Sequence, residues 1–368
     1  MALLSAVSRV VMTNNLTGLW FPTLVMILIV ACGTACQQEK RYSFVSDWKF
    51  ALEEIQGSVQ DAYAQKFKEL IEQRTNNEIS VTVYPYGTLG TSDQVTELIH
   101  MGAIQFATAS PGHLGKTIPE LQLFLLHFVF SNDNAVNQAV LGESQVLRDY
   151  IDQLYQHKGL KFLTLYPEGW QVWTTNKEIR QPRDFAGLKI RVMTSPMLLR
   201  AYAAYGANPT PLPYSEVYSA LQLHMIDAQV NPVFAIEEMG FYEVTDYLIF
   251  PRHAQFVTSV VTNPHFFEAL PTDKQQLITE VITELNSYIF TVQETFNSER
   301  LKTMRTRKPN LQIRYLTAAE RDAFRTASLP VRQQYIDMVG PRGNELLTIL
   351  LEEVVKAEQE RGSSPNTD

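Results

Sequence analysis

Cysteine is nearly absent from this chain. Its only two cysteines, Cys32 and Cys36, lie close to the N-terminus, so the long remainder has no cysteine for an internal disulfide or a thiolate metal site. A surplus of basic residues is also lacking, since 31 Lys and Arg stand against 39 Asp and Glu and the formal net charge is -8. A protein that binds nucleic acid through its phosphates needs the opposite balance. We therefore expect no nucleic-acid partner.

Catalytic signatures are missing as well. The 7 histidines are scattered without a pair at metal-ligand spacing, and the chain has no Gly-x-Gly-x-x-Gly, Gly-x-Ser-x-Gly or His-Glu-x-x-His motif. Residues 112–117 read GHLGKT after an expected strand, but a phosphate-binding loop has four residues between its glycines and this segment has two. The sequence predicts recognition rather than catalysis, with no metal and no cofactor.

The N-terminal residues 1–31 are typical of an export signal. They contain no acidic residue and one basic residue, Arg9. Their apolar stretch, Leu19 to Ala31, is shorter than the roughly 20 residues that a membrane-spanning helix needs, and its length suits the apolar region of a signal peptide. We therefore expect the mature protein outside the cytoplasm, in the periplasm.

The apolar stretch ends in Ile-Val-Ala before Cys32, which resembles a bacterial lipobox, where the cysteine is acylated and becomes the mature N-terminus. We predict a signal peptide over 1–31, lipidation at Cys32 with anchoring to a membrane, and a polar tether over 32–43. Acylation at Cys36, an ordinary signal peptide cut near Ala35, and a short uncleaved anchor are the alternatives.

The rest of the chain alternates strand and helix signals. Residues 59–74 repeat apolar side chains at helical spacing, residues 79–83 alternate as a strand, and Thr91 with Gln94 forms a capping box before another helix. This order predicts a largely parallel sheet covered by helices. Residues 273–307, without proline or glycine, predict a helix roughly 50 Å long. Its apolar face is wide, which favours a brace across two domains over a coiled-coil arm.

The most specific signal spans residues 187–232. The chain reads GLKIRVM at 187–193, GANPTP at 206–211, SEVYSALQ at 215–222 and DAQVNP at 227–232. In order and spacing these segments resemble the periplasmic solute-binding proteins of TRAP transporters, the DctP family. The likeness extends from about Trp48 to about Phe256 and continues more weakly through the long helix.

This resemblance implies an α/β fold, the two-domain periplasmic-binding-protein clamshell with a long helix bracing both domains. The cleft would close on an organic acid, and the protein would then dock on TRAP permease subunits driven by a sodium gradient. We expect domain I in 44–168 plus 257–300, domain II in 169–256 plus 301–360, and a disordered tail in 361–368.

The family pattern also marks ligand-binding residues. Arg191 matches the arginine that forks onto the ligand carboxylate, a role that suits a guanidinium because it stays charged and its donors fit both carboxylate oxygens. Asn231 matches the asparagine that hydrogen-bonds the ligand from the second domain, and Tyr214 matches an aromatic residue of the pocket. By the residues alone, Arg191 could form a structural ion pair, Asn231 an N-cap and Tyr214 a hydrophobic staple.

Two departures from the family pattern bear on the substrate. Gln171, preceded by Trp170, stands where many relatives have a second arginine, and Glu53 stands where sialic-acid binders have a neutral asparagine. Arg191 and Glu53 would then balance, and a dicarboxylate would bring an uncompensated charge into the cleft. We expect a monocarboxylate or a zwitterion, such as a compatible solute, with Trp170 in an apolar or cation-accepting wall. The alternative is that Glu53 faces solvent beside Glu54.

Three other functions are weighed against this one. A binding protein of an ABC importer would share the clamshell but not the long brace helix or the spacing of Arg191 and Asn231. A sensor that passes its ligand to a signalling receptor is compatible with the sequence. A surface-anchored α/β hydrolase would need a nucleophile with a base, or a metal constellation, and neither is found.

Overall fold

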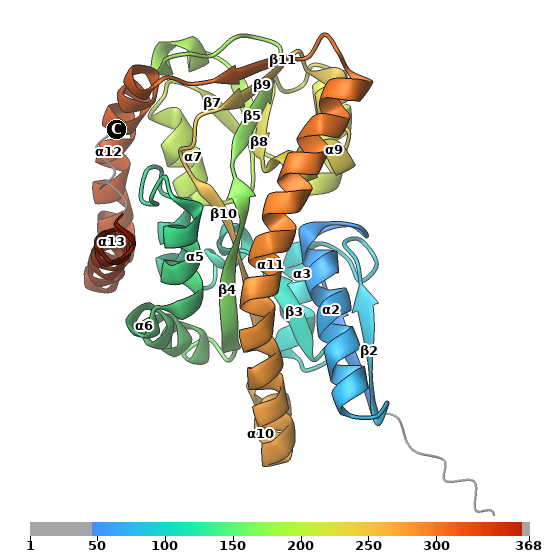
Figure 1. Cartoon of the computed structure of the whole chain (residues 1–368). Helices are drawn as coiled ribbons and strands as arrows, with labels where there is room; N and C mark the ends of the chain where they lie inside the picture. The colour runs from blue at the N-terminus through green and yellow to red at the C-terminus, as the bar shows by residue number, and fades with distance from the viewer. Residues whose placement is uncertain (1–45, 363–368) are drawn as a thin grey trace, which may run out of the picture. The chain divides into compact units, whose positions relative to one another are not determined.

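The computed structural model describes residues 46–362 (Figure 1). The predicted signal peptide, Cys32, Cys36 and the tether lie outside the described residues, as do residues 363–368 of the predicted tail. The tail prediction is wrong at its start, because Arg361 is the last residue of helix α13 (Pro341–Arg361) and Gly362 ends that helix with φ 65°. Within residues 46–362, no helix has the length and apolarity needed to cross a membrane.

Within residues 46–362, five strands form the first sheet, in the order β2-β1-β3-β10-β4. β1 (Ser46–Ala51) is parallel to β2 (Ile79–Tyr84) and β3 (Phe106–Ala109), whereas β10 (Gln255–Thr262) is antiparallel to β3 and β4 (Lys161–Trp170). The expectation of a largely parallel sheet is therefore wrong, and the sheet is mixed. The chain leaves the first sheet through β4 and returns to it through β10, so these two strands run in opposite directions.

In the described part of the chain, six strands form the second sheet, in the order β11-β9-β5-β8-β6-β7. Their bounds are β5 (Val172–Thr175), β6 (Lys189–Val192), β7 (Asn208–Pro211), β8 (Ala228–Asn231), β9 (Tyr247–Phe250) and β11 (Gln312–Tyr315). β6 is parallel to β7 and β8, and β9 is parallel to β11, whereas β5 is antiparallel to β8 and β9. With helices beside each sheet, the chain has the expected α/β fold of a two-domain clamshell.

Local sequence signals account for the first helices. α2 (Val59–Arg74) begins where Ser58 accepts a hydrogen bond from the backbone N–H of Asp61. α3 (Ser92–His100) begins with the predicted capping box, in which Thr91 and Gln94 each bond the other's backbone N–H. These side chains satisfy donors that a helix start would otherwise leave unpaired.

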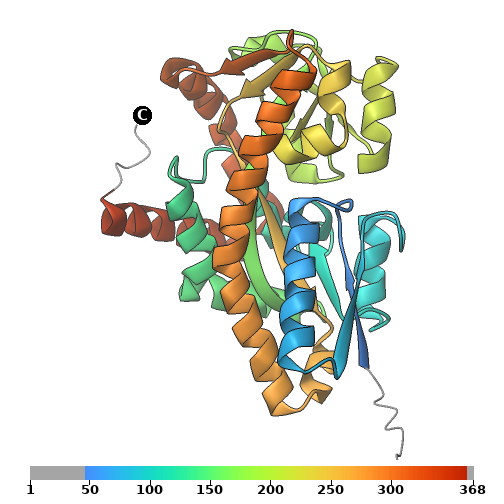
Figure 2. The same cartoon turned by 45° about the vertical axis from the view of Figure 1, so that its right-hand side comes forward.

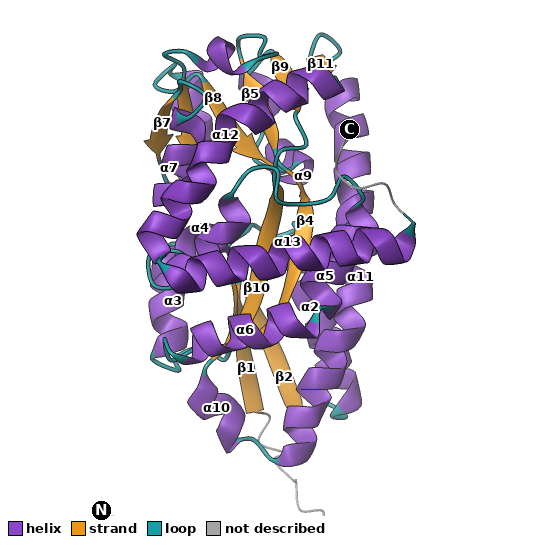
Figure 3. Cartoon of the chain, turned by 90° about the vertical axis from the view of Figure 1, so that its left-hand side faces the viewer, coloured by secondary structure: helices purple, strands orange, loops and turns teal. Residues whose placement is uncertain are grey.

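The remaining helices have these bounds: α4 (Pro111–Leu114), α5 (Asn134–Glu143), α6 (Gln145–Gln156), α7 (Pro196–Ala203), α8 (Val217–Gln222), α9 (Val233–Glu238), α10 (Pro264–Ala269), α11 (Thr272–Arg307), α12 (Ala318–Val339) and α13. α13 packs against α5 and α6 (Figure 3). The proposed division places 301–360 in domain II. Within that segment, β11 lies in the second sheet, whereas α13 contacts helices of the segment proposed as domain I.

Helix α11, which is 36 residues long, is the predicted brace. It contacts α2 and β4 on the side of the first sheet, and α9 on the side of the second sheet (Figure 2). Ile278, Val281 and Leu285 are buried in the core that covers the first sheet, and Met304 is buried in a separate core beside the second. Since one rigid helix is anchored in both cores, it links the two domains mechanically.

Aromatic rings fill part of the core that covers the first sheet, and they allow a prediction about stability. Phe106 is 0% exposed, and its ring centroid lies 4.9 Å from that of Phe67 and 5.5 Å from that of Trp48. Phe106→Ala should lower the free energy of unfolding by about 3–5 kcal/mol, because it removes buried area and leaves a cavity. Denaturant unfolding measures this, with Met101→Ala, 70% exposed, as the control expected within about 0.5 kcal/mol of wild type. Matching unfolding midpoints for the two variants would contradict the prediction.

Candidate ligand-binding site

The carboxyl ends of strands from both sheets surround one cavity of about 140 Å³. The segments that follow β1, β2 and β3 reach it from the first sheet, and the ends of β6, β7 and β8 reach it from the second. Ligands of open α/β sheets bind at this end of the strands, because the loops there can vary while the strands hold them in place. The cavity is therefore the candidate site.

Arg191, on β6, is a buried cation in this cavity and is 2% exposed. Its Nε and Nη2 donate to the carbonyl oxygen of Leu212 at 3.0 and 2.8 Å. Burial lowers the pKa of Arg191 to about 10, so it is still protonated at neutral pH. None of the ion pairs formed within residues 46–362 includes Arg191, which sets aside the structural ion pair and leaves its charge without a counter-ion.

Asn231 and Tyr214 also line the cavity, as the family resemblance implies. Asn231 ends β8 and its Nδ2 donates to Oε1 of Gln229 at 2.5 Å. The N-cap of α9 is Pro232, so Asn231 is not the cap. The ring of Tyr214 lies edge-on to that of Tyr86, with centroids 6.0 Å apart, and these two rings form an aromatic wall.

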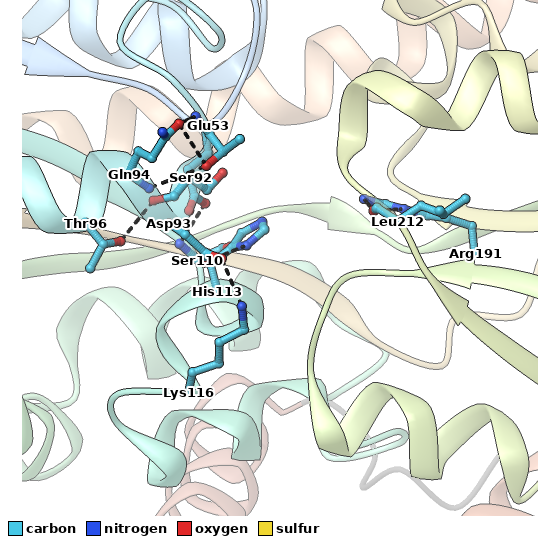
Figure 4. A network of polar contacts seen from close by, with 11 residues as sticks. Glu53, Ser92, Asp93, Gln94, Thr96, Ser110, His113, Lys116, Arg191 and Leu212 are labelled. Atoms are coloured by element: carbon cyan, nitrogen blue, oxygen red, sulfur yellow. Dashed lines mark hydrogen bonds and ion pairs between the residues drawn. The ribbon is translucent and has the colours of Figure 1, made fainter.

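Glu53 lies on the opposite side of the cavity from Arg191 (Figure 4). It is 7% exposed, so the alternative that it faces solvent is wrong. Its Oε2 accepts from the backbone N–H of Ser110 at 2.8 Å, and its Oε1 is buried without a hydrogen-bond partner among the described residues. Burial raises the pKa of Glu53 to about 8, although the hydrogen bonds from Ser110 act in the other direction.

An acid cluster behind Glu53 was missed in the sequence analysis. Glu54 lines the cavity, and burial together with the nearby charge of Glu168 raises its pKa well above the usual range. Gln60 joins the two acids, since its backbone N–H donates to Glu54 at 3.2 Å and its Nε2 donates to Glu168 at 3.1 Å. Burial also raises the pKa of Glu238 to about 8. Such buried acids favour a cationic group in the cavity.

Trp170 and Gln171 do not line this cavity with the other predicted site residues. Two expectations are therefore corrected, that Trp170 forms a wall of the ligand site and that Gln171 contacts the ligand. Trp170 lines a second cavity of about 680 Å³, where its Nε1 donates to Oδ1 of Asn134 at 2.8 Å and the guanidinium of Arg252 lies 5.6 Å from its ring centroid. Gln171 lines neither cavity, and its backbone N–H donates to the carbonyl of Ala254 at 2.9 Å.

The end of β4 explains this difference. Gly169 has φ 127°, and the pairing of β4 with β10 shifts register between Phe256 and Val257. Such a bulge turns the following side chains away from the face that simple alternation assigns to them. Phe256, on β10, lines the cavity with Arg191 instead.

The arrangement suits recognition of a molecule that carries both charges. A buried guanidinium faces buried carboxyl groups across a small cavity that has aromatic walls. Within residues 46–362, no three His, Cys, Asp or Glu side chains are grouped so as to hold a metal ion. The residues that line the cavity thus offer ionic and hydrogen-bonding contacts to a small organic ligand.

Comparisons with known proteins identify the family of this chain. The family model described as bacterial extracellular solute-binding protein, family 7, DctP, matches residues 50–337. The ectoine/5-hydroxyectoine-binding periplasmic protein UehA of Ruegeria pomeroyi is 38% identical over 323 residues, which cover 87% of this chain and 92% of that relative.

Solved structures of TRAP solute-binding proteins also match this chain. A TRAP periplasmic solute-binding protein from Marinobacter aquaeolei, in an apo open structure, is 44% identical with a TM-score of 0.79, over 83% of this chain and 99% of that one. The periplasmic ectoine-binding protein of the TeaABC TRAP transporter of Halomonas elongata is 35% identical with a TM-score of 0.82, over 84% of this chain and 100% of that one. This chain therefore belongs to the DctP family, the periplasmic solute-binding proteins of TRAP transporters.

Proposed function

We propose that this protein captures a small zwitterion, ectoine or a close analogue, in the periplasm and delivers it to a sodium-coupled TRAP permease. The observation that carries the proposal is a pairing of two buried groups in one cavity. Among the residues that the structure describes, Arg191 has no counter-ion and one carboxylate oxygen of Glu53 has no hydrogen-bond partner. Ectoine presents a carboxylate and a delocalised cation on one small ring. Each charge of the ligand then meets an opposite charge of the protein.

The carboxylate end is assigned to Arg191 and Asn231. A guanidinium has five N–H donors, and the carbonyl of Leu212 occupies only the Nε donor and one on Nη2. The remaining donors can fork onto a carboxylate, and burial strengthens that pair because water does not screen it. Asn231 adds an amide from the end of β8, next to the start of α9.

The cationic end is assigned to Glu53 and Glu54, with the rings of Tyr86 and Tyr214 beside it. Carboxylates and aromatic faces both attract a delocalised cation. A dicarboxylate would instead place its second charge against these acids, and a buried like-charge contact of this kind is costly. Two relatives whose names include ectoine, at 38% and 35% identity, support the same choice.

Titration calorimetry on the purified protein tests the proposal, with ectoine and succinate compared at the same pH and salt concentration. We expect one ectoine per protein and succinate binding at least about 100-fold weaker, a difference of roughly 2.7 kcal/mol. Recovery of unchanged ectoine after long incubation is the control that separates a receptor from an enzyme. Succinate binding as tight as that of ectoine would contradict the assignment of Glu53.

Membership of the TRAP family sets aside the ABC-importer alternative. Delivery to a permease is favoured over a role as a sensor because solved relatives are named as TRAP-transporter components. The lipid anchor at Cys32 is proposed on the lipobox-like sequence alone, since Cys32 lies outside the described residues.

A further inference from the structure

Asn297, on the brace helix α11, forms hydrogen bonds with two elements on different sides of the ligand cavity, β4 and α9, without lining the cavity itself. Its Nδ2 donates to the carbonyl of Glu168, on β4 of the first sheet, at 2.8 Å. Its Oδ1 accepts from the backbone N–H of Phe234, in the first turn of α9, at 3.2 Å. α9 follows Asn231 after a single residue. We call the side of the cavity formed by Glu53 and Glu54, with Glu168 in contact behind them, the acid wall. One amide thus ties the acid wall to the turn that carries Asn231.

The start of α9 needs a partner of this kind. A helix leaves its first backbone N–H groups without partners inside the helix, and a neighbouring polar side chain normally accepts from one of them. The N-cap of α9 is Pro232, which has no side-chain acceptor. Asn297 supplies the acceptor from another element, so the position of the α9 start depends on α11.

The backbone of β4 is shaped for the same contact. Gly169 follows Glu168 with φ 127°, and a Cβ at Gly169 would lie 2.5 Å from Nδ2 of Asn297. A larger residue would therefore prevent the close approach. The carboxyl of Glu168 is in turn bonded by Gln60, which lines the cavity together with Glu54. A continuous set of contacts leads from the acid wall through Asn297 to Asn231.

We infer that Asn297 is a positioning residue that holds Asn231 in register with the acid wall, so that both domains contact the same bound ligand. The choice of ligand in its test rests on the proposed function. A bound ligand stabilises the closed state only through contacts that it makes with both walls. Loss of Asn297 removes no side chain that lines the cavity, but it lets the turn at Asn231 shift, which should weaken binding from a distance.

Asn297→Ala is compared with Asn286→Ala in ectoine calorimetry and stopped-flow dissociation. Asn286 lies on the same helix and accepts from Oγ1 of Thr164 on β4 at 2.9 Å, so it tests a bond that reaches the first sheet alone. We expect Asn297→Ala to raise Kd roughly tenfold, mostly through faster dissociation, and Asn286→Ala to stay within about twofold. Asn297→Asp keeps the acceptor for Phe234 but loses the donor to Glu168, and should fall between alanine and wild type.

A second measurement does not depend on the ligand. Pulsed EPR measures the distance between two spin labels, one attached to each domain at Met101→Cys and Met225→Cys. The two methionines are 70% and 60% exposed, so labels there should disturb little. Cys32 and Cys36 are changed to serine so that only these two sites are labelled. Without ligand, the distance distribution should be broader in Asn297→Ala than in wild type and unchanged in Asn286→Ala.

The two measurements separate the possible failures. If wild type does not bind ectoine, the proposed function fails, while the distance distributions still decide the role of Asn297. Wild-type affinity in Asn297→Ala would overturn the inference, as would equal distributions in the two alanine variants. Equal losses of affinity and melting temperature in both variants would also overturn it, because they would show a purely structural role.

Discussion

Arg191→Ala should weaken ectoine binding by about 2–5 kcal/mol, which corresponds to roughly 30-fold to 5,000-fold in Kd. The guanidinium is 2% exposed and has no counter-ion within the described residues, so the ligand carboxylate would be its charge partner. Removing it leaves that carboxylate buried against an apolar methyl group. Titration calorimetry measures the loss directly.

Two further variants define what Arg191 contributes. Arg191→Lys keeps the positive charge but loses the planar donors that contact both Leu212 and a carboxylate, so its affinity should lie between those of alanine and wild type. Arg200→Ala on α7 removes a cation whose Nη1 donates to the carbonyl of Gln334, and it should leave affinity unchanged. Wild-type affinity in Arg191→Ala would remove this residue from the site.

Arg191, Asn231 and Tyr214 were predicted through the family resemblance, and the structure places all three in the lining of one cavity, while their contacts with a ligand stay predictions. Each lies at or just after the carboxyl end of a short strand that a recognisable motif defines. Local pattern also predicted α2, the capping box of α3 and the 36-residue α11. Helix starts, hydrophobic spacing and strand ends depend on neighbours within a few residues.

Trp170 and Glu168 could not be placed by such local reasoning. The face that Trp170 presents depends on a register shift between β4 and β10, strands about ninety residues apart in sequence. Glu168 lies in a buried strand and meets Glu54 and Gln60 only after folding. The one local signal for this acid cluster is the pair of adjacent glutamates, Glu53 and Glu54, soon after a buried strand. The sequence prediction placed only Glu53 of this pair in the site.

Affinity for ectoine should rise as the pH is raised from neutral to about pH 8, by up to about tenfold per pH unit for each proton that binding releases. Burial raises the pKa of Glu53 to about 8 in the free protein, so this carboxyl is mostly protonated at neutral pH. A bound cation favours the carboxylate and lowers that pKa. The complex then holds fewer protons than the free protein, and raising the pH favours it until Glu53 is ionised in both states.

Other charged groups near Glu53 define the control. Burial lowers the pKa of His113 to about 4, and Arg191 has a pKa of about 10, so neither changes charge in this range. Glu54 and Glu168, whose pKa values are also raised, act in the same direction as Glu53. Glu53→Gln should therefore flatten the dependence without abolishing it, and should bind more weakly at about pH 8. A wild-type slope in Glu53→Gln would contradict the assignment.

The sign of the pH dependence distinguishes the two classes of ligand. Calorimetry in buffers of different ionisation enthalpy should show that wild type releases a proton when ectoine binds, because the cation displaces it from the acid wall. A dicarboxylate would have the opposite effect, since its second charge favours protonated Glu53 and Glu54, and its affinity would fall as the pH rises. Proton uptake, or an affinity for ectoine independent of pH, would contradict a cation bound beside Glu53.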